Sequence, residues 1–108
     1  MTGIELIAQE RERQITYSGY TAEHDDKHDK GELASAACYF AWPIELGISH
    51  RQIVASDLYP WNWSEGHADR EYKPRIRQLA IAGALIAAEI DRLQRLSAKQ
   101  EANNADAL

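Results

Sequence analysis

Residues 75–99 have the sequence RIRQLAIAGALIAAEIDRLQRLSAK, and this stretch decides the fold. Its apolar residues recur at intervals of three and four, which is the period of one face of an α-helix. That face comprises Ile76, Leu79, Ala80, Gly83, Ile86, Ile90, Leu93 and Leu96, and Ile81 and Leu85 widen it. Pro74 suits the first turn of a helix, where its missing N–H costs nothing. We therefore predict a helix of about 24 residues, roughly 36 Å long.

The predicted helix is longer than the other elements of a 108-residue chain can cover. Its centre, Ala82-Gly83-Ala84, carries almost no side-chain bulk, so another helix can approach closely. We therefore expect this helix to self-associate, which makes the chain a homo-oligomer. The last residues, QEANNADAL, have no apolar pattern that would form a core. The sequence predicts one helical domain over residues 1–98 and a flexible C-terminal tail over residues 99–108.

Three shorter helices are expected upstream. Thr2 and Glu5 have capping-box spacing and predict a helix over residues 3–16, ended by Ser18-Gly19. Asp29 and Glu32 predict the start of a second helix, which ends before Pro43. A short third helix is expected between Ser49 and Leu58. The polar stretch 20–31 is expected to be a loop. Because strand-like alternation is absent throughout, the predicted fold class is all-α.

Composition excludes several classes of protein. The net charge of −5 opposes binding to a nucleic-acid polymer. No apolar run approaches the ~18 residues that a membrane span needs. The single cysteine, Cys38, excludes a disulfide framework within the chain, and we expect it to be buried in the second helix. These features predict a cytoplasmic protein.

The first candidate site is an acidic cluster with two histidines in residues 23–32. His24, Asp25, Asp26, His28 and Glu32 offer nitrogen and oxygen ligands within a short stretch. This mixture suits a divalent metal ion such as Zn²⁺ or Mn²⁺, or Mg²⁺ through the oxygens alone. One alternative is a solvated acidic turn whose carboxylates pair with Lys or Arg and whose Asp29 caps a helix. Another is a site that holds a ligand by hydrogen bonds alone.

The second candidate is a basic cluster at the start of the long helix, formed by Arg70, Lys73, Arg75 and Arg77. A helix N-terminus also carries unpaired N–H groups, and the two together favour a phosphate. The alternative is that the acidic loop neutralises these charges. Trp61 and Trp63 lie in the preceding loop and are candidates for stacking on a nucleobase, or for packing over a thin helical core.

Three strings occur together here: GIELIAQERERQI, GYTAEHDDKHDKGELASAACYFA and YKPRIRQLAIAGALIAAEIDRL. As a set they resemble a widespread, functionally unassigned family of small phage and prophage accessory proteins. Members usually have tryptophan where Tyr20 stands. The resemblance implies a phage-type protein that acts in bacterial cytoplasm, on nucleotides or on host defence.

Three functional hypotheses follow. In the first, the chain binds a small phosphate-bearing ligand such as a nucleotide. The phosphate contacts are then made by Arg70, Lys73, Arg75 and Arg77. Trp61 and Trp63 stack on the base, and His24 and Asp26 bind the polar edges of the base. In the second, the metal-ligand candidates hold a divalent ion for a nucleotide phosphohydrolase. In the third, the chain binds and inhibits a host protein. The first two require the regions around residues 24 and 75 to meet.

Overall fold

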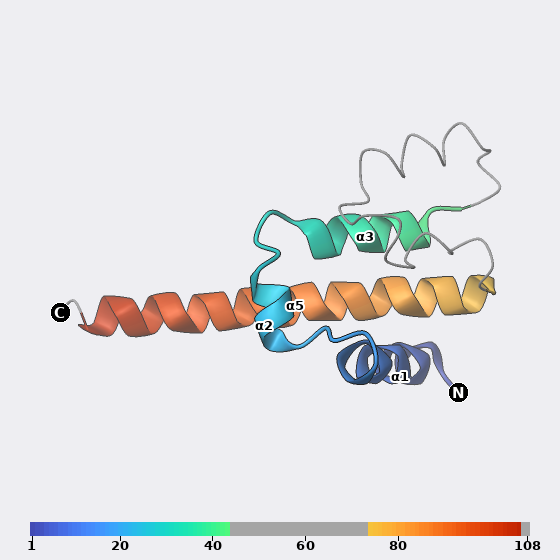
Figure 1. Ribbon diagram of the computed structural model, residues 1–108, viewed down its shortest axis with the longest axis horizontal. Helices are drawn as coiled ribbons and strands as arrows, with labels where there is room; N and C mark the ends of the chain where they lie inside the picture. The colour runs from blue at the N-terminus through green and yellow to red at the C-terminus, as the bar shows by residue number, and fades with distance from the viewer. Residues whose placement is uncertain (44–73, 107–108) are drawn as a thin grey trace.

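The computed structural model describes residues 1–43 and 74–106. This part of the chain forms four α-helices: α1 (Gly3–Thr16), α2 (Ala22–Asp26), α3 (Glu32–Ala41) and α5 (Arg75–Asp106). The long helix α5 is central, and each of the other three packs against it (Figure 1). The predicted all-α fold with a long C-terminal helix is therefore confirmed. The short helix expected between Ser49 and Leu58 lies outside the described residues.

Helix α1 begins and ends as its sequence predicts. Thr2 accepts a hydrogen bond at its Oγ1 from the Glu5 backbone N–H (3.2 Å), and Glu5 Oε1 accepts one from the Thr2 N–H (2.8 Å). This reciprocal capping box satisfies two donors that the first turn leaves unpaired. The helix ends at Thr16, and the chain then turns through Gly19, whose φ of +74° favours glycine.

Two predictions for residues 20–32 were wrong. The stretch expected to be a loop contains α2, which begins where Thr21 Oγ1 accepts a hydrogen bond from the His24 N–H (3.3 Å). Asp29 does not cap the next helix. Instead Gly31 takes a left-handed conformation (φ +83°) at the start of α3, and the Glu32 carboxylate accepts a hydrogen bond from the Lys30 N–H (2.6 Å). Glycine at this position, rather than aspartate spacing, sets the start of the helix.

The C-terminal stretch also differs from the prediction. Residues 99–106 continue α5 as a helix instead of forming a tail without structure. Alanine, lysine, glutamine and glutamate, which dominate residues 98–102, all have high helix propensity. The C-terminal residues do not contribute to a hydrophobic core, as expected. Residues 96–106 are exposed, and α5 projects beyond the other helices (Figure 1).

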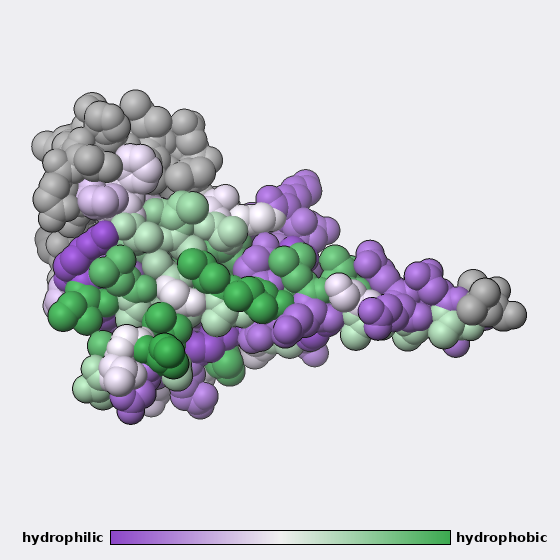
Figure 2. Space-filling model, turned by 180° about the vertical axis from the view of Figure 1, so that it is seen from behind, coloured by the Kyte–Doolittle hydropathy of each residue, from purple (hydrophilic) through white to green (hydrophobic). Residues whose placement is uncertain are grey.

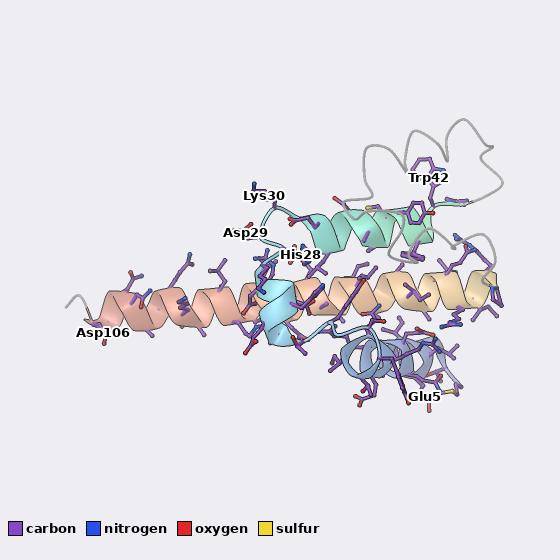
Figure 3. All side chains as sticks on the ribbon, in the orientation of Figure 1. Glu5, His28, Asp29, Lys30, Trp42 and Asp106 are labelled. Atoms are coloured by element: carbon purple, nitrogen blue, oxygen red, sulfur yellow. The ribbon has the colours of Figure 1, made fainter. Side chains whose placement is uncertain are left out.

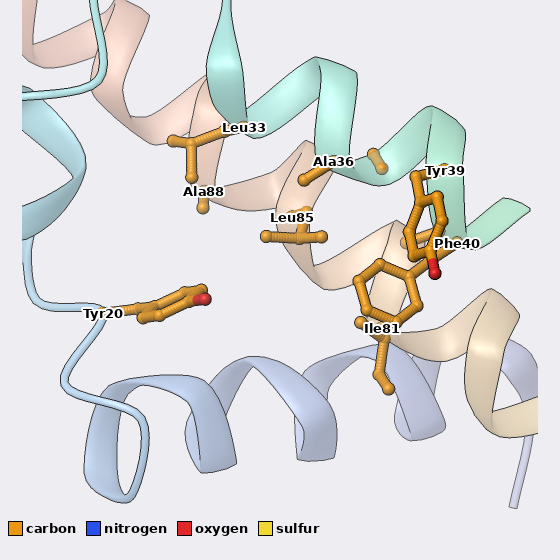
Figure 4. Close-up of a cluster of buried hydrophobic side chains, with 10 residues drawn as sticks. Tyr20, Leu33, Ala36, Tyr39, Phe40, Ile81, Leu85 and Ala88 are labelled. Carbon is orange, nitrogen blue, oxygen red and sulfur yellow. The ribbon is translucent and has the colours of Figure 1, made fainter. Parts of the chain in front are cut away.

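The hydrophobic core lies mainly between α3 and one side of α5 (Figure 4). Small side chains occupy much of this side of α5, so the two helix backbones can lie close together. Tyr20, from the α1–α2 connection, closes one end of the core. The buried apolar residues of the cluster are Tyr20, Leu33, Ala36, Ala37, Tyr39, Phe40, Ile81, Ala82, Leu85 and Ala88.

Gly83, at the centre of α5, allows α1 to pack closely against this helix. A Cβ atom built on Gly83 would lie 2.6 Å from Cδ1 of Ile7 and 2.7 Å from its Cγ1. Any larger residue there would therefore collide with the Ile7 side chain. The close approach expected at Ala82-Gly83-Ala84 occurs, and the helix that makes it belongs to the same chain.

Within the described residues, no helix combines the length and the apolar content needed to cross a bilayer.

We predict that Gly83→Leu destabilises the protein through Ile7. Overpacking costs about 1–3 kcal/mol, and replacing a mid-helix glycine returns up to ~1 kcal/mol. The free energy of unfolding, measured by urea denaturation at a fixed protein concentration, should therefore fall by up to about 2 kcal/mol. In an Ile7→Ala background the same substitution should be neutral or stabilising, because only the propensity gain remains. An equal loss in both backgrounds would contradict this contact.

Candidate functional site

A buried carboxylate holds α2 in place. The Asp25 side chain is 0% exposed, and its Oδ2 accepts a hydrogen bond from Nη2 of Arg11 on α1 (2.9 Å). Arg11 Nη1 also donates to the Tyr20 carbonyl (3.4 Å). A buried carboxylate is strongly unfavourable unless it is paired and hydrogen-bonded. The Arg11–Asp25 ion pair therefore fixes α2 against α1.

The two histidines extend this network within the chain. The Nδ1 atom of His24 lies 2.9 Å from Asp25 Oδ1, and its ring stacks on Tyr20 at a centroid distance of 4.4 Å. The ring of His28 meets His24 edge-on at 4.7 Å, and His28 Nδ1 lies 3.2 Å from Glu32 Oε2. Each imidazole therefore has a carboxylate partner supplied by α2 or α3.

Glu32 is ionised more readily than an ordinary glutamate. Partial desolvation raises its pKa, but hydrogen bonds from the backbone N–H groups of Glu32 and Lys30 and from His28 outweigh this effect. The net result is a lowered pKa, which keeps the carboxylate charged at the start of α3. Negative charge there is also favoured by the helix dipole.

The five predicted metal ligands do not converge on one point. Within residues 1–43 and 74–106, no three or more His, Cys, Asp and Glu side chains are grouped so that they could hold a metal ion. Asp25 is committed to Arg11 and His24, and His28 to Glu32. Asp26 Oδ1 accepts a hydrogen bond from Arg95 of α5 (2.8 Å). Asp26 fits the alternative interpretation, that of an exposed acidic turn paired with basic residues, because its side chain is half exposed.

The two basic residues of the described N-terminal turn of α5 also have partners within the chain. Arg75 donates hydrogen bonds to the carbonyl oxygens of Phe40 (3.2 Å), Ala41 (2.6 Å) and Trp42 (3.3 Å). These carbonyls lie at the C-terminal end of α3, where no further helical N–H is available to them. Arg77 donates to Glu10 of α1 through Nε (3.0 Å). Arg75 and Arg77 thus tie α3 and α1 to α5.

The regions around residues 24 and 75 do not meet within one chain. Arg95 hydrogen-bonds to Asp26 and to the Ala22 carbonyl, so α2 contacts α5 about twenty residues after Arg75, or ~30 Å along the helix. Figure 3 shows the same separation, with His28 and Trp42 at opposite ends of α3. The other ligand-binding candidates, Trp61, Trp63, Arg70 and Lys73, lie outside the described residues.

Sequence reasoning missed the structural roles of Arg11 and Arg75. Arg11 stands among the apolar residues Ile4, Ile7, Ala8 and Ile15 on one face of α1. A charged residue on such a face needs an oppositely charged partner, so the sequence did indicate an ion pair at Arg11. No comparable signal existed for Arg75, because its partners are backbone carbonyls 33 to 35 residues away. Cys38, expected to be buried, is exposed on α3.

One face of α5 stays largely uncovered in the described structure. Ile76, Leu79, Gly83, Ile86, Ile90 and Leu93 follow one another at intervals of three and four, and we call this set the apolar stripe. Its five Ile and Leu side chains are 46–68% exposed, whereas Gly83 is half-buried beneath Ile7 of α1. At about 100° per residue, the stripe lies on the side of α5 opposite Ile81 and Leu85 of the core. Figure 2 shows a hydrophobic band along the molecule toward the projecting end of the long helix.

A shallow groove continues the apolar stripe along the projecting part of α5. It is lined by Ile90, Leu93, Gln94, Ser97, Ala98 and Glu101. The stripe and this groove together form a surface suited to another helix, since exposed side chains three and four apart act as knobs and the spaces between them as holes.

Comparison of the chain with models of protein families, with curated proteins and with solved structures finds no match.

We predict that Asp25→Asn destabilises the protein far more than Asp26→Asn. The first change leaves the Arg11 guanidinium without its counter-charge in a largely buried position, at a cost of about 2–4 kcal/mol. The second removes only an exposed pair with Arg95, worth under ~1 kcal/mol. Urea denaturation of both variants at neutral pH measures the difference. Equal losses of stability would show that the Arg11–Asp25 ion pair does not anchor α2.

Proposed function

We propose that this chain is an interaction protein, which acts by binding another protein on the apolar stripe of α5. The observation that supports this most strongly is the exposure of five Ile and Leu side chains in one helical register. Contiguous exposed apolar surface of this kind is typical of protein-binding sites. The third hypothesis from the sequence is thereby favoured over the other two.

The charged residues support the same choice. A phosphate bound through Arg75 and Arg77 would compete with the carbonyls at the C-terminal end of α3 and with Glu10 for these guanidinium groups. A metal ion bound through Asp25 would compete with Arg11 for this carboxylate. Each step costs free energy that the ligand must supply. Binding a protein on the apolar stripe breaks none of these contacts.

The expected driving force is hydrophobic. The exposed portions of the five side chains amount to roughly 500 Å² of apolar surface, so covering them releases roughly 12 kcal/mol before the entropic costs of association. In the phage setting implied by the resemblance, a protein of the bacterial host is one class of partner. The stripe itself requires only that the partner present a complementary apolar helix or groove.

Site-specific photo-crosslinking tests this function. A benzoylphenylalanine at Ile90, on the stripe, should form a protein adduct when bacterial cells that make the variant are irradiated. The matched control is the same amino acid at Asp91, which is also exposed but points about 100° away around the helix. We expect at least about tenfold more adduct at position 90, because the helical rotation per residue places only that side chain on the stripe. Absence of adduct at both positions, or equal adduct at both, would contradict the proposal.

A further inference from the structure

We propose that the apolar stripe binds a second copy of this chain, with the two α5 helices antiparallel. This inference rests on the proposed function, since it names the partner of the same surface.

The spacing of the stripe is unchanged when its direction is reversed. Its positions follow at intervals of 3, 4, 3, 4 and 3 residues, so a two-fold axis between Gly83 and Ile86 maps the stripe onto itself. A two-fold dimer needs such a self-complementary patch, in which residue i contacts j and j contacts i. The resulting pairs are Ile76 with Leu93, Leu79 with Ile90, and Gly83 with Ile86. Every pair is apolar, and no charged residue enters the stripe.

The position of Ile7 is compatible with this pairing. Ile7 of α1 lies over Gly83, in the space that a Cβ atom of residue 83 would take, and its side chain is half-buried there. In the antiparallel pair the Ile86 side chain of the second copy would lie beside Gly83 and against Ile7. At the centre of the interface, the apolar contact would therefore be made between Ile86 of one copy and Ile7 of the other.

Charge at the projecting end favours the antiparallel over the parallel arrangement. Glu101 lines the groove that continues the stripe, and it is exposed. In a parallel pair with matched residue numbers, the two Glu101 carboxylates would meet across the extended interface and repel each other. In the antiparallel pair they lie at opposite ends of the dimer. Antiparallel helix dipoles are also favourable to each other.

The exposed area is close to what a stable dimer needs. The stripe exposes the equivalent of about two and a half complete Ile or Leu side chains. Ile4 of α1 is 81% exposed, and it lies one turn from Ile7, which contacts the stripe at Gly83. Together these surfaces give roughly 650 Å² per chain, compared with ~800 Å² per partner in an interface of standard size.

Analytical ultracentrifugation of the purified full-length chain tests this inference. The wild type should sediment with twice the monomer mass, and Ile90→Glu should raise the dimer dissociation constant at least about 100-fold, because each interface would bury two unpaired carboxylates. The matched control is Leu96→Glu, which changes a similarly exposed leucine of the same helix that lies beyond the paired positions. It should remain dimeric. Circular dichroism establishes that both variants are helical.

Disulfide cross-linking tests the orientation independently of these variants. In a Cys38→Ser background, a chain with Leu79→Cys should cross-link on oxidation to a chain with Ile90→Cys, and neither should cross-link efficiently to itself. Efficient Leu79→Cys homodimers would overturn the antiparallel arrangement. A wild type that remains monomeric at ~100 µM would overturn self-association altogether. If such a monomer still forms an adduct with a different protein through position 90, the proposed function stands and only this inference fails.

Discussion

Packing against one side of α5 is the constraint on which the rest of the structure depends. In the described part of the chain, α1, α2 and α3 each pack against this helix. The side chains of α5 are small where α3 and α1 approach it from different directions. These small residues are alanines 80, 82, 84 and 88 and glycine 83. The larger Ile81 and Leu85 fill the space that remains beneath Phe40 and Tyr39. A long helix surrounded on only part of its circumference necessarily exposes the remainder.

Charged side chains serve this architecture by joining the smaller helices to one another and to α5. The Arg11–Asp25 pair joins α1 to α2, Arg95 holds α2 on α5, and Arg75 satisfies the carbonyls at the end of α3. Because these contacts are spread along about 30 Å of α5, the acidic residues of α2 and the described basic residues Arg75 and Arg77 lie in separate places within one chain. In the described part of the chain, the apolar stripe is the surface on which we propose that a protein binds.

The sequence predicts those features that depend on local periodicity and capping. The 3–4 spacing after Pro74 identified α5, and the Thr2/Glu5 pair identified the start of α1. It could not predict α2, because five residues have too little periodicity to distinguish a helix from a polar turn; the buried Arg11–Asp25 contact supplies the stability. It also could not assign Arg75, whose hydrogen-bond acceptors are backbone atoms brought near by tertiary folding. The register of the apolar stripe was visible in the sequence, but only the fold distinguishes its exposed side from the side that packs on α3.

The central claim is that α5 carries an apolar face which a second copy of the chain covers. Amide hydrogen exchange along α5, measured on the purified chain at several protein concentrations, tests it most directly. Residues 93–106 lie at or beyond the edge of the packed helices, and an isolated helical segment of that length is only marginally stable in water. Through residues 86–93, which belong to the paired stripe, the account predicts slow exchange at high concentration and much faster exchange on dilution. Rapid exchange over these residues at every concentration would contradict it.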